Sequence, residues 1–238
     1  MRSFTVAAFI AVANLAVAQQ PIECVSVNAD GSGDGGVDEY SSNPISADGR
    51  YVAFPSHSSR IVAGDVNGVD DVFVRDRLTG TSVMVSVASD GTLGDGDSFN
   101  PGISGDGRYV AFSSFATNLV QDDANGTRDV FLRDRDPDGN GVFDEGNATT
   151  IILSRKTNGD PSDSVSDRPA ISGDGSTVVF ESGEELTPDS GGGQNIFAYD
   201  IASGVLSCVS LAFDGGPSGG GSGGASISEN GRFVAFES

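Results

Sequence analysis

The segment Ile103–Phe112 reads ISGDGRYVAF, and close copies of it occur three more times along the chain. The copies are ISADGRYVAF at Ile45–Phe54, ISGDGSTVVF at Ile171–Phe180 and ISENGRFVAF at Ile227–Phe236. They begin 58, 68 and 56 residues apart, so a unit of nearly constant length recurs and carries one insertion. Recurrence at such a spacing predicts a repeat architecture, in which one supersecondary unit is stacked several times.

Each unit contains the same parts in the same order. An Asp-Gly or Asn-Gly pair favours a tight hairpin turn, and an apolar strand such as Tyr109–Phe112 follows it. A polar loop then leads to a second strand, for example DVFLRD at Asp129–Asp134, and a third strand such as IILSR closes the unit. With the segment before the turn, this order predicts about four short strands in each unit.

The strand cores are nearly continuous apolar runs, which indicates sheets covered on both faces. Four-stranded sheets that repeat and are buried on both faces are typical of β-propeller blades. We therefore predict an all-β chain, with a β-sandwich as the alternative. The complete units lie near residues 43–88, 100–155 and 168–212, and partial units lie at 22–28 and 225–238.

The combination ISGDGRYVAF…DVFLRD resembles the blade of TolB-type, WD-repeat-like propellers. That family usually has Trp-Ser-Pro-Asp-Gly, where this chain has Ile for the Trp and Gly or Ala for the Pro. The resemblance covers residues 23–238. It implies three complete repeats and partial blades at both ends, which we interpret as a fragment of a larger propeller; a four-bladed ring is the alternative.

The first eighteen residues have the pattern of a secretory signal peptide. Arg2 precedes an apolar stretch from Phe4 to Leu15, and the small residues Ala16-Val17-Ala18 offer a cleavage site. We expect residues 19–238 to be exported to the periplasm or the extracellular space, with an uncleaved membrane anchor as the alternative. Cys24 and Cys208 occupy equivalent positions in the repeat, on different blades, so we expect buried free thiols rather than a disulfide.

The net charge of −21 bears on the class of partner. Nucleic acids and anionic lipids require a cationic surface, and this chain contains a single lysine. We therefore expect no nucleic-acid partner and no membrane insertion of the mature chain. Arg75, Arg77, Arg133 and Arg135 flank Asp76 and Asp134, and we expect ion pairs there between neighbouring blades.

The insertion contains an acidic stretch, DPDGNGVFDEG, at residues 136–146. Oxygen donors fall at positions 1, 3, 5, 7 and 9 of a calcium loop, with Gly141 at position 6, where a sharp turn is needed. Hard oxygen ligands favour calcium over zinc. The predicted ligands are Asp136, Asp138, Asn140, the Val142 carbonyl and Asp144. Calcium there would be structural; a solvated acidic turn is the alternative.

The remaining motifs do not predict catalysis. Ser218 and Ser222 match Gly-x-Ser-x-Gly, but they lie in a glycine-rich stretch without the strand-to-helix turn that a hydrolase needs. His57 is the only histidine, which leaves a zinc site or a serine–histidine pair with little support. The Asn-Gly sequences at Asn67 and Asn125 are sufficiently explained as turns, with metal binding as the minor alternative.

From the sequence we expect an exported, non-catalytic propeller that binds a protein partner on its ring face and that contains a calcium-stabilised loop. The competing hypothesis is the propeller domain of a larger secreted hydrolase, a peptidase or a glycosidase.

Overall fold

The computed structural model describes residues 23–32 and 44–238, and this part of the chain contains thirteen β-strands and no helix. The expected signal peptide, residues 1–18, lies outside the described residues. None of the described residues forms a helix long and apolar enough to cross a membrane. The strands are β1 (Tyr51–Ser56), β2 (Asp71–Asp76), β3 (Thr81–Met84), β4 (Ser98–Ile103), β5 (Tyr109–Ser114), β6 (Asp129–Asp134), β7 (Thr149–Ile152), β8 (Ser166–Ile171), β9 (Thr177–Ser182), β10 (Asn195–Asp200), β11 (Val205–Cys208), β12 (Gly223–Ile227) and β13 (Val234–Glu237).

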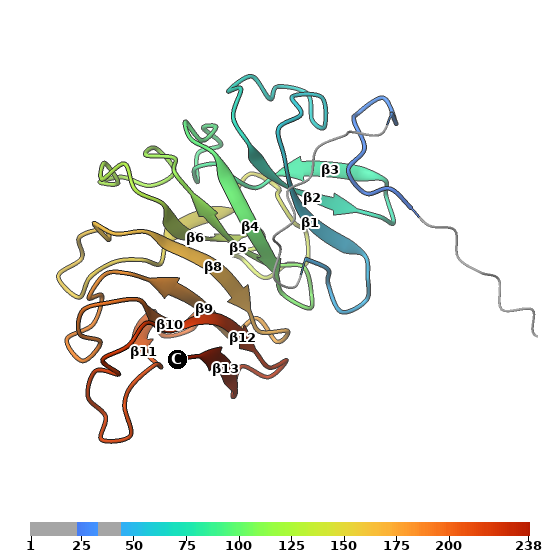
Figure 1. Cartoon of the computed structure of the whole chain (residues 1–238). Coiled ribbons are helices and arrows are strands. Elements are labelled where there is room, and N and C mark those ends of the chain that lie inside the picture. The colour runs from blue at the N-terminus through green and yellow to red at the C-terminus, as the bar shows by residue number, and fades with distance from the viewer. Residues whose placement is uncertain (1–22, 33–43) are drawn as a thin grey trace, which may run out of the picture.

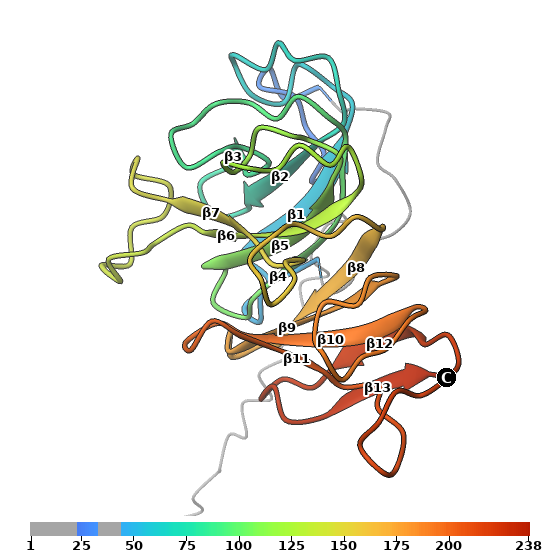
Figure 2. The same ribbon diagram turned by 90° about the vertical axis from the view of Figure 1, so that its left-hand side faces the viewer.

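The strands form successive antiparallel sheets that follow the chain (Figure 1). The second blade is β4-β5-β6-β7 and the third is β8-β9-β10-β11. The first blade is β1-β2-β3, and Ile45 adds an isolated bridge to Val52 at its free edge. Strands β12 and β13 form a pair that packs beyond the third blade (Figure 2). The expected all-β fold of propeller blades is confirmed, and two of the blades in the described residues have four strands.

The apolar runs are continuous because each central strand faces a neighbouring sheet on both sides. Val110 and Phe112 of β5 lie in one apolar cluster with Val72 of the first blade, whereas Ala111 between them lies in the cluster that contains Phe180 of the third. Within the blade Phe112 stacks on Phe131, with ring centroids 5.8 Å apart. Burying a side chain of this size stabilises by about 1.5–3 kcal/mol before the entropy cost is counted.

The Asp-Gly turns also join the blades. In the second blade Asp106 accepts hydrogen bonds from the Ser104 hydroxyl at 2.6 Å and from the Arg108 amide, and Gly107 has φ +82°. The Gly105 amide donates to the Gly173 carbonyl of the third blade at 2.8 Å. A Cβ on Gly105 would lie 2.6 Å from that carbonyl oxygen, which explains why this repeat has glycine there.

A second repeated turn follows the last strand of each blade, and we call it the closing turn (residues 88–92 and 156–160, with copies at 28–32 and 212–216). Its first amide donates to the carbonyl four residues on, as from Ala88 to Thr92 and from Lys156 to Asp160. Its glycine amide donates back to the first carbonyl, at 2.9 Å from Gly91 and 2.8 Å from Gly159. The backbone geometry is thus the same at each copy.

Two expectations from the sequence need correction. Cys24 and Cys208 are both free, and Cys208 is buried as expected, but Cys24 is exposed. Asp76 and Asp134 pair within their own blades, with the turn residues Arg50 and Arg108. The turn arginines reach these carboxylates because β1 and β5 begin directly opposite the ends of β2 and β6.

Candidate binding pocket and acidic loop

The acidic loop connects β6 to β7 and is closed by its own hydrogen bonds. Asp136 is 4 % exposed and accepts from the amides of Asn140 at 3.0 Å and Gly141 at 2.9 Å. Burial opposes the ionisation of Asp136, but these amide donors bring its pKa below the ordinary value. Asp138 accepts from the Asn140 side chain at 3.1 Å. The loop is therefore a tight turn in which backbone amides donate to the carboxylate of Asp136.

Asp144, the fifth predicted ligand residue, is held by an arginine. Nε and Nη2 of Arg135 donate to its Oδ2 at 2.9 and 2.7 Å. The same guanidinium lies over the rings of Phe143, 4.8 Å away, and of Tyr51 in the first blade, 5.1 Å away. The inserted hairpin therefore packs across the interface between the first two blades.

Among residues 23–32 and 44–238, no group of three or more His, Cys, Asp or Glu side chains is arranged to hold a metal ion. Val142, whose carbonyl would be the seventh-position ligand, lies on the exposed part of the loop. Calcium binding by this loop remains a prediction.

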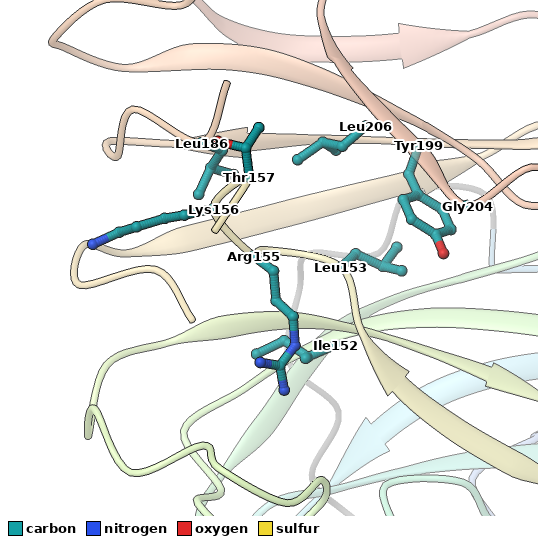
Figure 3. Close-up of a pocket in the computed structure, with 9 residues that line it drawn as sticks. All are labelled: Ile152, Leu153, Arg155, Lys156, Thr157, Leu186, Tyr199, Gly204 and Leu206. Atoms are coloured by element: carbon teal, nitrogen blue, oxygen red, sulfur yellow. The ribbon is translucent and has the colours of Figure 1, made fainter. Parts of the chain in front are cut away.

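A pocket of about 330 Å³ opens between the second and third blades (Figure 3). The closing turn of the second blade forms one wall, and β10 and β11 of the third blade form the other. Residues that line it include Leu153, Lys156, Thr157, Leu186, Tyr199 and Leu206. None of the lining residues is Asp, Glu, His, Ser or Cys, so the most common general bases and nucleophiles do not face this pocket.

Two titratable groups of the pocket, Lys156 and Tyr199, have raised pKa values. Lys156 is 2.5 Å from Asp163 and 3.3 Å from Glu184, and the hydrogen bond to Asp163 leads the contacts that raise its pKa, so its ammonium stays charged. Burial, assisted by the nearby Asp200, raises the pKa of Tyr199 and keeps its phenol neutral. The pocket therefore presents a charged amine and a neutral phenol.

A buried polar network, which the sequence analysis missed, recurs in the blades. Asp129 is fully buried; the Ser154 hydroxyl and the Asn125 amide group donate to its carboxylate, the latter at 2.7 Å. Asp71 has the same two kinds of partner in the first blade, Ser86 and Asn67. The third blade has Asn195 in the equivalent place, bonded to Ser210 at 3.0 Å. The repeated Asp-Val-Phe and Asn-Gly motifs were the signal for this network.

Burial raises the pKa of both Asp71 and Asp129 to about 6, against the hydrogen bonds from the serines and asparagines. Asp123, near Asp129, is also buried, and one of its carboxylate oxygens has no hydrogen-bond partner. Asp71 and Asp129 each join their strand to an asparagine of the preceding loop and to a serine that follows the last strand of the blade. Both carboxylates are screened from solvent, which favours a structural role.

The other sequence candidates are apart from one another and from the pocket. His57 is exposed, and its Nδ1 lies 2.9 Å from Asp70. Ser218 hydrogen bonds to the Gly220 carbonyl within its own loop, and Ser222 is buried. The structure therefore brings no serine–histidine pair together in the described residues.

No protein-family model matches the chain, and no curated protein matches it. Among solved structures, TolB from Acinetobacter baumannii aligns with a TM-score of 0.47 and 16 % identity, over 88 % of this chain and 41 % of that one. A putative TolB from Agrobacterium tumefaciens aligns with a TM-score of 0.46 and 14 % identity, over 86 % of this chain and 60 % of that one. An oligogalacturonate lyase from Vibrio parahaemolyticus aligns with a TM-score of 0.42 and 14 % identity, over 76 % of this chain and 44 % of that one.

The chain thus spans about two fifths and three fifths of the two TolB chains it resembles in fold. These two structures belong to the repeat class that the sequence resembles, and the third is named for an enzyme. The architecture of the molecule is that of β-propeller blades.

Proposed function

We propose that this chain is an exported, non-catalytic propeller module that binds a protein partner. The observation that carries the proposal is the pocket between the second and third blades. It is open and partly apolar, and it presents the charged amine of Lys156 and the neutral phenol of Tyr199. The acidic net charge favours a partner with a basic binding segment.

We further propose that calcium stabilises the acidic loop. Asp136, Asp138 and Asn140 supply oxygen donors of the kind that calcium prefers. A calcium ion that also used Asp144 would compete with Arg135 for that carboxylate. The affinity should therefore be weak, about 0.1–1 mM, as in extracellular modules.

The binding role is tested by selecting random displayed peptides against the immobilised full chain. We expect enrichment of a shared motif whose synthetic peptide binds saturably with one site per chain. A selection that enriches no motif would contradict the proposal.

The hydrolase alternative is tested in parallel with chromogenic peptide and glycoside substrates. We expect no turnover above buffer. Turnover that disappears in the double variant Ser218→Ala/Ser222→Ala would establish a hydrolase and overturn the non-catalytic assignment.

A further inference from the structure

The three interfaces between successive closing turns and blades share one structural position, which we call the interblade slot. In each slot the fifth residue of β2, β6 or β10 pairs with a residue of the last strand of the same blade, β3, β7 or β11. These cross-strand pairs are Arg75 with Ser82, Arg133 with Thr150, and Tyr199 with Leu206. Each pair lies beside the closing turn that precedes its blade, so the repeat itself allows the three slots to be compared.

The slot between the first and second blades is filled by Arg133. This side chain is 7 % exposed, and its Nη1 donates to the carbonyls of Val87 and Ala88 at 3.3 and 3.2 Å and to the Thr150 hydroxyl at 2.9 Å. The Thr150 hydroxyl in turn donates to the Val87 carbonyl at 2.7 Å. The closing turn of one blade thus binds a guanidinium that the next blade supplies.

The slot between the second and third blades is the open pocket of Figure 3. Arg155 and Lys156 are the residues equivalent to Val87 and Ala88. The Lys156 carbonyl accepts from Gly159 as the Ala88 carbonyl accepts from Gly91, so the two turns have the same shape. The Arg155 carbonyl accepts no hydrogen bond from the described residues, since Leu206 replaces the hydroxyl and Tyr199 replaces the guanidinium. The slot therefore retains its acceptors and lacks its donor.

The cationic side chains at the rim do not fill the slot. The Arg155 guanidinium donates to the Gly159 and Gln121 carbonyls, at 2.6 and 3.3 Å. Lys156 is paired with Asp163 and Glu184, and in Figure 3 its side chain runs away from Tyr199. Tyr199 lines the space instead, and an aromatic ring is a favourable surface for a guanidinium.

We propose that this slot binds the guanidinium of an arginine side chain presented by a partner protein. The inference rests on the proposed binding role and specifies the chemistry of the partner. The incoming guanidinium takes the place that Arg133 takes one interface earlier: it donates to the Arg155 and Lys156 carbonyls and stacks on Tyr199. The volume of about 330 Å³ is sufficient for one such side chain.

The direct test is a calorimetric titration of the full chain with Nα-acetyl-arginine amide. The citrulline compound, which has the same shape without the charge, and the lysine compound serve as controls. We expect saturable binding of the arginine compound at least tenfold tighter than binding of either control. Equal binding of arginine and lysine would show a site for positive charge alone and overturn the guanidinium assignment.

Two further ligands separate the possible sources of the guanidinium. A Gly-Arg-Gly peptide blocked at both ends should bind at least as tightly as the amide. Free arginine that binds tenfold tighter than both would assign the slot to a free amino acid and contradict a protein partner. A peptide motif without arginine from the display selection would leave the binding role standing and remove this proposal.

The slot is located by a variant that fills it. Tyr199→Arg/Leu206→Thr recreates the Arg133 and Thr150 set, so it should raise the unfolding midpoint and weaken arginine binding at least tenfold. Leu206→Phe adds volume only and provides a second test should the double variant not fold. Val205→Thr, on the exposed neighbouring residue, is the matched control and should bind as the wild type does. Undiminished binding by both filling variants would place the arginine site elsewhere.

Discussion

At the scale of single residues, the buried carboxylates of Asp71 and Asp129 make stability depend on pH. Their folded-state pKa of about 6 lies above the ordinary 3.8, with burial as the main cause. A raised carboxyl pKa means that folding favours the protonated form. The stabilisation is full below pH 4 and is lost as the pH rises through 6. Asp76, whose pKa is lowered to about 2 mainly by Arg50, acts in a lower window, because its contribution is lost only as the pH falls from about 4 to 2.

The free energy of unfolding should therefore increase by about 1 kcal/mol for each of Asp71 and Asp129 when the pH is lowered from 7 to 5. Urea unfolding at the two pH values measures this difference. Asp129→Asn should remove about half of this pH-dependent difference, whatever the absolute stability of the variant. A pH difference unchanged in this variant would show that Asp129 does not titrate in that range.

The third blade indicates how the variant should be built. There Asn195 replaces the aspartate, and Gly191 occupies the place of Asn125. In Asp129→Asn alone, the new amide group would meet the amide donor of Asn125, which now bonds to Asp129. Asn125→Gly/Asp129→Asn removes that conflict and should be the more stable of the two variants at pH 7.

At the scale of elements, the strands were predictable and the acidic loop only in part. The Asp-Gly turns and apolar runs determine β5 and β9 locally, so their existence followed from the sequence. The insertion before β7 was also recognised. The ion pair between Arg135 and Asp144 was not predicted, because Arg135 was expected to pair with a neighbouring blade. Tyr51, which lies more than eighty residues earlier, completes this contact, and no local pattern reports it.

The calcium hypothesis concerns this same loop and is tested by thermal unfolding of the full chain in millimolar calcium and in chelator. We expect calcium to raise the midpoint, because an ion that binds only the folded loop stabilises it. Asp138→Ala removes one donor without touching the Arg135 contact and should abolish the rise. Asp214→Ala, at an exposed turn, is the control and should keep it. No rise in wild type would leave the loop a plain acidic turn.

At the scale of the whole molecule, the repeat period predicted the order of the blades, because each unit contacts mainly its neighbours along the chain. The differences between units were not predictable in the same way. The sequence has arginine at both 75 and 133, yet only Arg133 seats on the preceding closing turn. Within residues 23–32 and 44–238, the Arg75 guanidinium donates one side-chain hydrogen bond, to Ser82 of its own blade at 3.3 Å. The cross-strand partner also differs between the two slots, Ser82 for Arg75 and Thr150 for Arg133.

This difference predicts unequal coupling between blades. Arg133→Ala should lower the free energy of unfolding by about 2 kcal/mol, because it removes buried hydrogen bonds from a charged group. The matched variant Arg75→Ala should cost about 0.5 kcal/mol or less, as for a side chain outside such a network. Urea unfolding gives both values, and hydrogen exchange should show β1–β3 opening more readily in Arg133→Ala, since that side chain ties the first blade to the second. Equal losses of unfolding free energy in the two variants would mean that Arg133, in the slot between the first and second blades, stabilises the protein no more than Arg75, which bonds within its own blade.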